Sequence, residues 1–447
     1  MQPISVPDLA SPQFKANPYP FYARLRAEAP VYRITLPGTL GPRRAAWLVT
    51  RYEDVVSVLK DERLAKDPRN AMTPEQRAKT PWVPRAFKPL EHNMLDLDAP
   101  DHTRLRGLVH KAFTPRLVEQ LRERIQSLAD RLLDGVQRKG SLDLVADYAL
   151  PIPVTVIADL LGIPAGDRHS FHRWSRRIVA VSSNRDALRA IPNVWLFMRY
   201  LRKLFKARRA SPRDDLITAL IQAEEAGDRL SEDELLAMVF ILLIAGHETT
   251  VNLIASGTLT LLQHPEQMAL LKDDPSRIKP AIEELLRYTS PVEWSTERYA
   301  REEMTIAGVP IPRGEMVLGA IGSANRDEHQ FANPDSLLLT REPNRHLAFG
   351  QGAHYCLGAP LARLEGQVAF TTLLRRMPQL RLAAAPEALR WRRGLFLRGL
   401  ERLPLAFEPA AGRAVQSRAK RRREGARGTA VGEAVHPESG CDADSGA

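Results

Sequence analysis

Residues 231–263 carry the longest helical pattern in the 447-residue chain and constrain its fold more than any other segment. Ser231 followed by Glu234 is a capping box, which marks the start of a helix, and Pro265 marks its end. A helix of about 33 residues is roughly 50 Å long at about 1.5 Å per residue. We therefore expect one helix that crosses the whole molecule.

The first half of this helix, residues 235–246, is apolar on all sides. In a globular protein such a helix is surrounded by other elements. A membrane span is disfavoured because His247, Glu248 and Asn252 interrupt the apolar run. The sequence thus predicts a central buried helix with a polar patch at its middle, and the patch requires a reason.

The other secondary-structure signals are mostly helical, with a minor share of strands. A capping box of Thr50 and Glu53 predicts a helix that continues to about residue 59, and Thr114 with Pro115 predicts one that ends near Gly140. Further helices are expected at 19–28, 154–161, 168–181, 216–226 and 278–288, a hairpin at 31–36 and 45–49, and strands at 304–309 and 316–321. We assign the chain to the mainly α class with a minor β part.

Composition divides the chain into a body and a tail. With 44% hydrophobic and 26% charged residues the composition is that of a globular protein, and residues 1–409 contain no linker-like stretch, so we expect a single domain there. Residues 410–447 are rich in Ala, Gly, Ser and Arg without apolar periodicity, which predicts a disordered tail. The net charge is +11, of which the body keeps +9. The basic tail is interpreted as a solvated extension, with a nucleic-acid- or lipid-binding tail as the alternative.

Cysteine content and the N-terminus indicate the compartment. Cys356 and Cys441 are too few for a disulfide framework, and the first 30 residues contain no apolar signal segment. We expect a soluble cytoplasmic protein without a membrane anchor.

The stretch at 349–359, with the sequence FGQGAHYCLGA, holds the most specific chemical signal. It places the Cys356 thiol where a helical pattern begins, and a helix N-terminus favours the thiolate. Its three glycines allow close backbone approach to a flat ligand. A buried thiolate requires a cation, so the loop indicates a metal, whereas an isolated cysteine is usually a small apolar core residue.

This loop resembles the haem-binding loop of the cytochrome P450 superfamily, whose pattern is Phe-x-x-Gly-x-His-x-Cys-x-Gly. The resemblance implies haem b (iron protoporphyrin IX) as the cofactor, Cys356 as the axial ligand of its iron and His354 as a partner of a haem propionate. It also implies the P450 fold, a triangular helical body with a long central helix and small β-sheets.

A second match lies on the long helix, where residues 245–250, AGHETT, resemble the oxygen-activating motif of the family. The resemblance implies that Glu248 and Thr249 relay protons. The small residues at 245 and 246 are expected to leave room above a haem. Considered alone, the pair is equally consistent with a structural polar patch, and His247 is interpreted as a packing residue.

Two further motifs match the family in the expected order. Glu284 and Arg287 resemble its Glu-x-x-Arg signature, which implies an ion pair that braces the haem loop. His102 and Arg106, together with Arg298, resemble its propionate-binding groups. Any one arginine is most often a surface charge, but the matches support one another.

The resemblance implies a haem-thiolate monooxygenase that inserts one oxygen atom of O2 into a hydrophobic substrate. Electrons would come indirectly from NAD(P)H through a separate ferredoxin or flavodoxin and its reductase, with Arg363 as part of a basic docking face. The substrate would be polyketide-, macrolide-, terpene- or fatty-acid-like, and the protein is expected to be a monomer. The residues expected in the substrate pocket are Ile241, Ile244, Val292, Trp294, Phe396 and Leu397. Each of them is also consistent with a position in the apolar core.

Three alternatives remain open from the sequence. A haem-binding gas sensor or carrier would need the thiolate loop but not Glu248 and Thr249. A peroxide-driven hydroxylase typically lacks that acid–hydroxyl pair. A DNA-binding role would rest on charge alone, and no nucleic acid is expected as a partner.

Overall fold

The structure, a computed structural model, describes residues 4–36, 44–78, 93–179, 184–225, 228–377 and 379–409. Residues Met1–Glu408 form one compact unit. The predicted tail at 410–447 lies outside the described residues, as do the last residues of the helices expected at 168–181 and 216–226.

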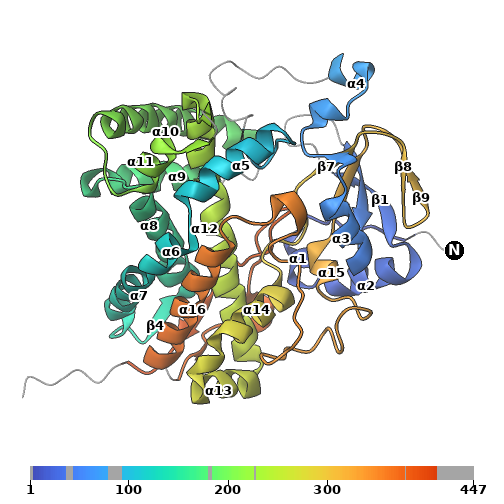
Figure 1. The fold of residues 1–447 in the computed structure, drawn as a ribbon. Coiled ribbons are helices and arrows are strands. Elements are labelled where there is room, and N and C mark those ends of the chain that lie inside the picture. The colour runs from blue at the N-terminus through green and yellow to red at the C-terminus, as the bar shows by residue number, and fades with distance from the viewer. Residues whose placement is uncertain are drawn as a thin grey trace, which may run out of the picture. The chain divides into compact units, whose positions relative to one another are not determined.

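Helices dominate the described chain, as predicted (Figure 1). They are α1 (Pro12–Ala16), α2 (Tyr19–Glu28), α3 (Tyr52–Lys60), α4 (Pro74–Ala78), α5 (Asp101–Ala112), α6 (Pro115–Gln120), α7 (Arg122–Val136), α8 (Pro151–Leu160), α9 (Arg168–Val179), α10 (Asn184–Ala210), α11 (Leu216–Gln222), α12 (Glu232–Gln263), α13 (Pro265–Asp273), α14 (Ile278–Thr289), α15 (Ile321–Ala324) and α16 (Ala359–Arg376).

The strands form small sheets. The five-stranded sheet has the order β1 (Val31–Leu36), β2 (Arg44–Val49), β10 (Met316–Gly319), β7 (Arg298–Ala300) and β3 (Leu64–Ala65). β1 and β2 form the predicted antiparallel hairpin, whereas β10 pairs with β2 in parallel. The other sheets are β11 (Arg381–Leu382), β12 (Pro404–Ala406) and β4 (Ser141–Asp143); β5 (Glu224–Glu225) and β6 (Asp228–Arg229); and β8 (Met304–Ile306) and β9 (Val309–Ile311).

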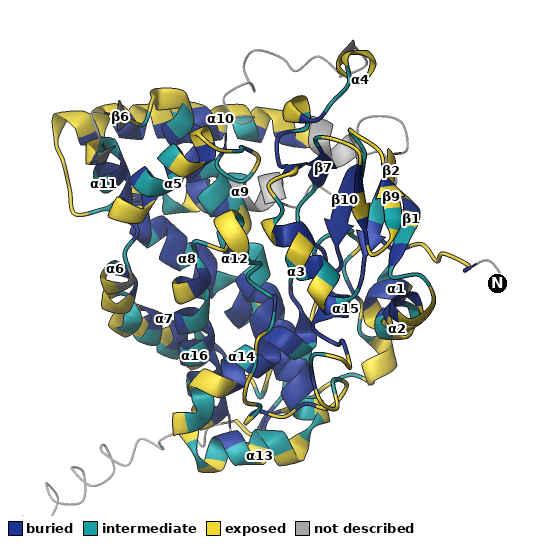
Figure 2. Cartoon of the chain, turned by 45° about the vertical axis from the view of Figure 1, so that its right-hand side comes forward, coloured by how far each residue is buried: buried dark blue, intermediate teal, exposed yellow. Residues whose placement is uncertain are grey.

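The long helix α12 is the centre of the fold. Its predicted capping box is present, because the Ser231 hydroxyl accepts from the Glu234 amide while the Glu234 carboxylate accepts from the Ser231 amide. By length and composition α12 alone among the described helices could cross a membrane, but it packs against α8, α14 and α16. It is therefore the core helix of the protein, and Figure 2 shows it mostly buried while α10 and α13 present exposed outer faces.

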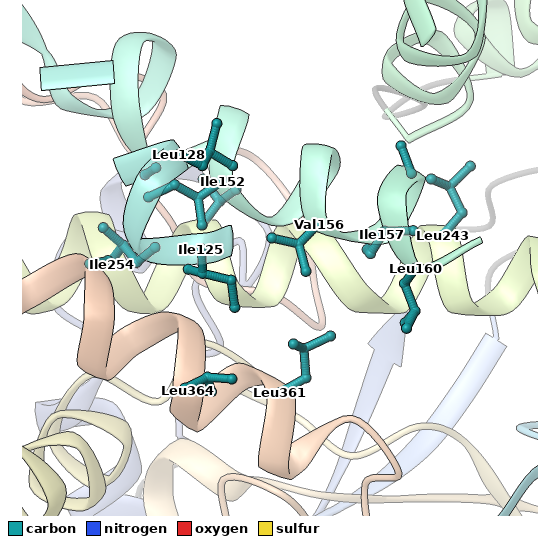
Figure 3. Close-up of a cluster of buried hydrophobic side chains, with 14 of the residues drawn as sticks. Ile125, Leu128, Ile152, Val156, Ile157, Leu160, Leu243, Ile254, Leu361 and Leu364 are labelled. Atoms are coloured by element: carbon teal, nitrogen blue, oxygen red, sulfur yellow. The ribbon is translucent and has the colours of Figure 1, made fainter. Parts of the chain in front are cut away.

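The largest core lies where α7, α8, α12 and α16 meet (Figure 3). Leu361 and Leu364 of α16 lie beside α12, with Leu361 nearer to Leu243 and Leu364 nearer to Ile254. The beginning of α16 therefore points toward the middle of α12. Since Cys356 lies three residues before the first residue of α16, this packing brings the thiol loop toward the polar patch of the long helix.

Several predicted boundaries are wrong. The helix expected from Thr114 to Gly140 divides at Leu121, where the amide bonds to the Val118 carbonyl in a tighter turn, and α7 ends at Val136. The strand expected at 304–309 is a hairpin, since a turn with positive φ at Ala307 and Gly308 separates β8 from β9.

The capping box predicted at Thr50 and Glu53 is also wrong. The Thr50 hydroxyl donates to the Pro30 carbonyl at 3.0 Å, and α3 begins after Arg51 without a cap from that side chain. The carboxylate of Asp327 accepts instead from the Tyr52 amide at 2.7 Å. Asp327, which is distant in the sequence, thus accepts the hydrogen bond at the start of α3 that the local capping box was expected to provide.

Candidate active site

The thiol loop owes its shape to two glycines. Gly350 and Gly352 have φ angles of 67° and 74°, which residues with a Cβ rarely adopt. A Cβ at Gly352 would also lie 2.9 Å from the Leu59 carbonyl oxygen at the end of α3. The Cys356 amide donates to the Phe349 carbonyl at 2.9 Å, which closes the loop and directs the chain into α16.

The Cys356 thiol is reachable by solvent although protein surrounds it closely. Burial raises the pKa of this thiol, and the amides of Gly358 and Ala359 together with the charge of Arg106 oppose the rise only in part. The expected thiolate-favouring effect of the helix start is therefore present but outweighed. A metal cation bound to the sulfur would displace the thiol proton, so the donor fits the iron of a haem.

Basic side chains gather beside the thiol loop. The rings of His102 on α5 and His354 in the loop lie with their centroids 4.0 Å apart. Arg106, one turn beyond His102, donates to the Tyr355 carbonyl at 2.6 Å. Arg298 on β7 donates to the carbonyls of Val58 and Leu59 at 2.9 and 3.1 Å. The structure thus brings together all four groups that the sequence assigned to the propionates.

Lys66 is a fifth basic group that the sequence interpretation missed. It follows β3, which pairs with β7, and its Nζ donates to the Thr296 hydroxyl at 2.7 Å and the Glu297 carbonyl at 2.6 Å. Burial and the neighbouring Arg298 lower the pKa of Lys66 to about 7. Nothing in the local sequence marks this lysine, because only the pairing of two distant strands places it here.

The electrostatics of this basic cluster suit bound anions. Burial, and then the charges of His102, Lys66, Arg298 and Arg106, lower the pKa of His354 to about 2. His102 Nε2 and Arg298 Nη1 are buried without a hydrogen-bond partner among the described residues. Two carboxylates placed here would satisfy both orphaned donors and offset the repulsion, so the cluster fits the propionates of a haem.

The middle of α12 is open, whereas the segments on either side of it, 235–239 and 250–261, are buried. Ile241, Ile244, Ala245, Glu248 and Thr249 are all at least partly exposed, and their spacing of three or four places them on one face. This face carries two apolar side chains beside an acid and a hydroxyl.

Gly246 has a different role from the expected one. A Cβ there would lie 2.8 Å from the terminal methyl of Ile157, so this glycine allows α8 to approach α12 and does not make room on the open face. Ala245 is the small residue that leaves the face open, since its side chain is exposed in mid-helix.

The polar residues of the patch are held in distinct ways. The Thr249 hydroxyl donates to the Ala245 carbonyl at 2.9 Å, and α12 continues through it unbroken. Glu248 accepts a 3.2 Å hydrogen bond from Arg392, a partner that the sequence interpretation missed. His247 is buried with Nδ1 2.7 Å from the Leu243 carbonyl oxygen, which fits its interpretation as a packing residue.

Glu284 and Arg287 form the expected ion pair on α14. Both side chains are fully buried, and two hydrogen bonds of 2.7 and 2.8 Å join them. Arg287 also donates to the carbonyls of Asn325 and Pro334, and Glu284 accepts from the Leu338 amide. The pair thus fixes the chain that leads into the thiol loop.

The residues expected in the substrate pocket do not all suit that role. Val292 and Leu397 form an isolated β-bridge, and with Phe396 they are half-buried, as a pocket wall requires. Trp294 is fully buried, and its indole donates to the Tyr22 hydroxyl at 2.7 Å. We therefore correct the assignment of Trp294, which is a core side chain.

Arg363 is not the free docking cation that we expected. Its guanidinium forms two hydrogen bonds of 2.7 and 2.8 Å with Glu283, and it stacks on the ring of Phe349. Burial alone would raise the pKa of Glu283, but the hydrogen bonds from Arg363 and His346 outweigh it and lower that pKa to about 2. The charge of Arg363 is thus largely neutralised, and its main role is to hold the thiol loop against α14.

Glu365 on α16 is a third group, after Lys66 and Arg392, that the sequence interpretation missed. Its carboxylate is fully buried, and neither oxygen has a well-formed hydrogen bond with a described residue, although Thr250 lies close enough to lower its pKa slightly. Burial raises the pKa of Glu365 to about 8, so this carboxyl is mostly protonated at neutral pH.

A thiol at the start of a helix, a basic cluster suited to two carboxylates and a mid-helix acid–hydroxyl pair define the class of haem-thiolate enzymes. The family model described as Cytochrome P450 matches residues 12–378, and the chain belongs to this family. The predicted fold is thereby confirmed, and the protein is a cytochrome P450 monooxygenase with haem as its cofactor.

Named relatives cover nearly the whole chain. The polyketide biosynthesis cytochrome P450 PksS of Bacillus subtilis is 48% identical over 397 residues, which are 88% of this chain and 97% of the relative. The vitamin D(3) 25-hydroxylase of Pseudonocardia autotrophica is 46% identical over 403 residues, covering 90% of this chain and 96% of the relative. The solved structure of a myxobacterial cytochrome P450, CYP267B1, in complex with myristic acid has a TM-score of 0.83 and 44% identity, covering 90% of this chain and all of the other.

Proposed function

We propose that this enzyme inserts one oxygen atom of O2 into a carbon–hydrogen bond of an apolar organic substrate. The observation that carries the proposal is the open face of α12, where Ile241 and Ile244 lie beside Glu248 and Thr249. A helix that is buried along most of its length exposes apolar and proton-transferring groups together only there.

The residue roles follow from the chemistry of each group. Cys356 would ligate the iron, and the five basic groups would hold the propionates, namely His102, Arg106, Arg298, His354 and Lys66. Bound haem supplies the activation of O2 that no protein side chain provides. The braced pair of Glu284 and Arg287 would keep the thiol loop in position. The haem domain is assigned to residues 1–409.

Glu248 and Thr249 would deliver the protons that cleavage of O2 consumes. The Thr249 hydroxyl is held by the Ala245 carbonyl at 2.9 Å, so its oxygen lone pairs remain free to accept a hydrogen bond on the open face. Glu248 directly precedes Thr249 and is partly exposed, so the open face offers a carboxylate beside a hydroxyl. The presence of this pair favours turnover over a gas sensor or carrier and over a peroxide-driven enzyme.

The substrate is proposed to be a large apolar molecule of the polyketide, macrolide, terpene or fatty-acid type. Ile241 and Ile244 would contact it from α12. Val292, Phe396 and Leu397, which the bridge between Val292 and Leu397 brings together, would form a second contact surface. Support comes from the names of the relatives, which include a polyketide biosynthesis enzyme, a vitamin D hydroxylase and a complex with myristic acid.

Electrons are proposed to come from NAD(P)H through a separate acidic ferredoxin or flavodoxin and its reductase, in the cytoplasm. The body of the protein has a net charge of +9, which suits an acidic partner. Since Arg363 is paired with Glu283, we propose Arg345 as the docking residue instead. Arg345 is exposed, and it directly precedes His346, whose Nε2 lies 3.0 Å from a carboxylate oxygen of Glu283.

A spectral titration of the purified holoprotein with a panel of apolar compounds tests the proposal. A substrate that displaces water from the iron shifts the haem absorption band, and a compound of one of the four classes is expected to do so and then to yield a monooxygenated product with ferredoxin, reductase and NADPH. Binding without any oxygenated product across the panel would instead support a carrier.

A further inference from the structure

Four polar side chains follow one face of α12 from its centre toward its C-terminal end. Glu248, Asn252, Ser256 and Thr260 are spaced four residues apart, so they form one row along the helix. Asn252 and Ser256 are only 1% and 2% exposed. The row is therefore a polar strip inside an apolar interior.

The two middle members of the row are buried without a hydrogen bond to the described protein. The side-chain atoms Oδ1 and Nδ2 of Asn252 and Oγ of Ser256 form no hydrogen bond with any residue in the described part of the chain. Buried polar groups are nearly always hydrogen-bonded, and ordered water supplies the partner where protein does not. Three such atoms within about one helical turn indicate a short file of water molecules beside the row.

The far end of the row meets a recess in the molecular surface. Ser256 and Thr260 line this recess together with Trp391 and Arg398, and its volume of about 520 Å³ accommodates many water molecules. Ala23, an exposed residue, also lines it, so bulk water reaches the recess. Among the residues that the structure describes, those around Cys356 do not line it.

Residues 391–400 cover the row between the recess and Glu248. The backbone at Gly399 lies so close to α12 that a Cβ there would be 1.9 Å from Oδ1 of Asn252. Arg392, whose amide bonds to the Gly399 carbonyl at 2.9 Å, reaches Glu248 at 3.2 Å. The covered row thus has Glu248 at one end and the recess at the other.

We propose that this row is a water-filled proton path that leads from the recess to the Glu248 carboxylate. A proton enters from bulk water, passes along hydrogen-bonded water at Ser256 and Asn252, and binds to a carboxylate oxygen of Glu248, which passes it toward the Thr249 hydroxyl. Each water that gives up a proton receives another from the recess side, so no group is consumed. The inference rests on the proposed function, because it supplies the proposed proton relay.

Replacing Asn252 with leucine tests the path, because the volume is nearly kept while the polar atoms that hold water are lost. The matched control is Thr258→Val, which changes a buried residue of the same helix whose hydroxyl bonds to the Ile254 carbonyl at 2.7 Å. The assay uses holoenzyme and the compound with the largest spectral shift in the titration. We expect Asn252→Leu to raise the D2O solvent isotope effect on turnover several-fold, and to raise the share of electrons lost to peroxide by a similar factor. Haem content and affinity for the compound should stay unchanged. The control should match the parent in all of these measurements.

Ser256→Val serves as a second variant in case the first fails to fold, and a crystal structure of the parent provides a readout that does not depend on turnover. Ordered water bonded to Asn252 and Ser256 is expected, and a dry interior there would overturn the path. If Asn252→Leu and Ser256→Val both keep the isotope effect of the parent while Thr249→Ala loses electrons to peroxide, the path is refuted and the relay stands. A fully coupled Thr249→Ala would refute the relay itself and the path with it.

Discussion

The imidazole rings of His102 and His354 lie against each other in a tilted arrangement, with centroids 4.0 Å apart and ring planes inclined by 34°. One ring belongs to α5 and the other to the thiol loop. Nε2 of His102, which no described residue contacts by a hydrogen bond, is a buried donor beside three further basic groups. Such a contact is unfavourable unless anions share the site, which ties the stability of this region to bound haem.

Removing one member of the basic cluster should weaken haem retention. His102→Ala and Lys66→Met each remove a hydrogen bond to a charged group, worth about 1.5 kcal/mol or more, so we expect haem to be lost about tenfold faster. The rate is measured by haem transfer to an excess of apo-globin. Arg104→Ala is the control, because Arg104 lies on the same helix but pairs with Glu234. Loss rates equal to that of the control would contradict the propionate assignment.

Thr249→Ala should divert electrons from product to hydrogen peroxide. The substitution removes the hydroxyl that is proposed to pass protons, so NADPH consumption continues while coupling falls. Peroxide formed per NADPH consumed is the measurement. Thr258→Ala is the matched control, because its hydroxyl makes the same bond to a carbonyl four residues back but lies buried. Unchanged peroxide in Thr249→Ala would count against the relay.

Glu283→Gln should destabilise the protein in a pH-dependent way. The carboxylate has a pKa of about 2 in the folded protein and one near its ordinary value of 4.5 in the unfolded chain. Its contribution, about 1.5 to 3 kcal/mol, is therefore fully present above about pH 4.5 and is lost as the pH falls toward about 2.

Thermal unfolding midpoints of parent and Glu283→Gln, followed by circular dichroism from pH 7 to pH 3, check this prediction. The difference between the two midpoints should be largest near neutrality and shrink toward pH 3. A constant difference across that range would show that the carboxylate's charge does not stabilise the fold.

Arg345→Glu should slow electron delivery. Reversing an exposed charge beside the cluster of Glu283, His346 and Arg363 weakens attraction of an acidic ferredoxin, so we expect about a three- to tenfold slower first reduction at low ionic strength and convergence with the parent in high salt. Stopped-flow reduction measures this rate. Arg213→Glu, between α10 and α11, is the exposed control. Equal effects of the two substitutions would indicate a general charge effect without a docking site at Arg345.

The sequence predicts this protein well where information is local. The capping box at Ser231 and Glu234 and the spacing of Glu284 and Arg287 depend on neighbours along the chain, and the structure has both. The thiol loop is specific enough to indicate the family, which the family model confirms.

Contacts that depend on chain crossovers could not be predicted. Lys66 joins the basic cluster because β3 pairs with β7, and Arg392 meets Glu248 because residues 391–400 cover α12. Trp294 was misjudged for the same reason, since its burial depends on Tyr22 in α2. Local sequence patterns do not predict contacts between residues that are distant in the sequence.

Iron ligation by Cys356 is the central claim, and the absorption spectrum of the reduced protein under carbon monoxide tests it most directly. The parent should show the strongly red-shifted Soret band that thiolate ligation produces, and Cys356→Ala, reconstituted with haem, should lose that band. A parent without the shifted band, or a Cys356→Ala variant that keeps it, would contradict the account.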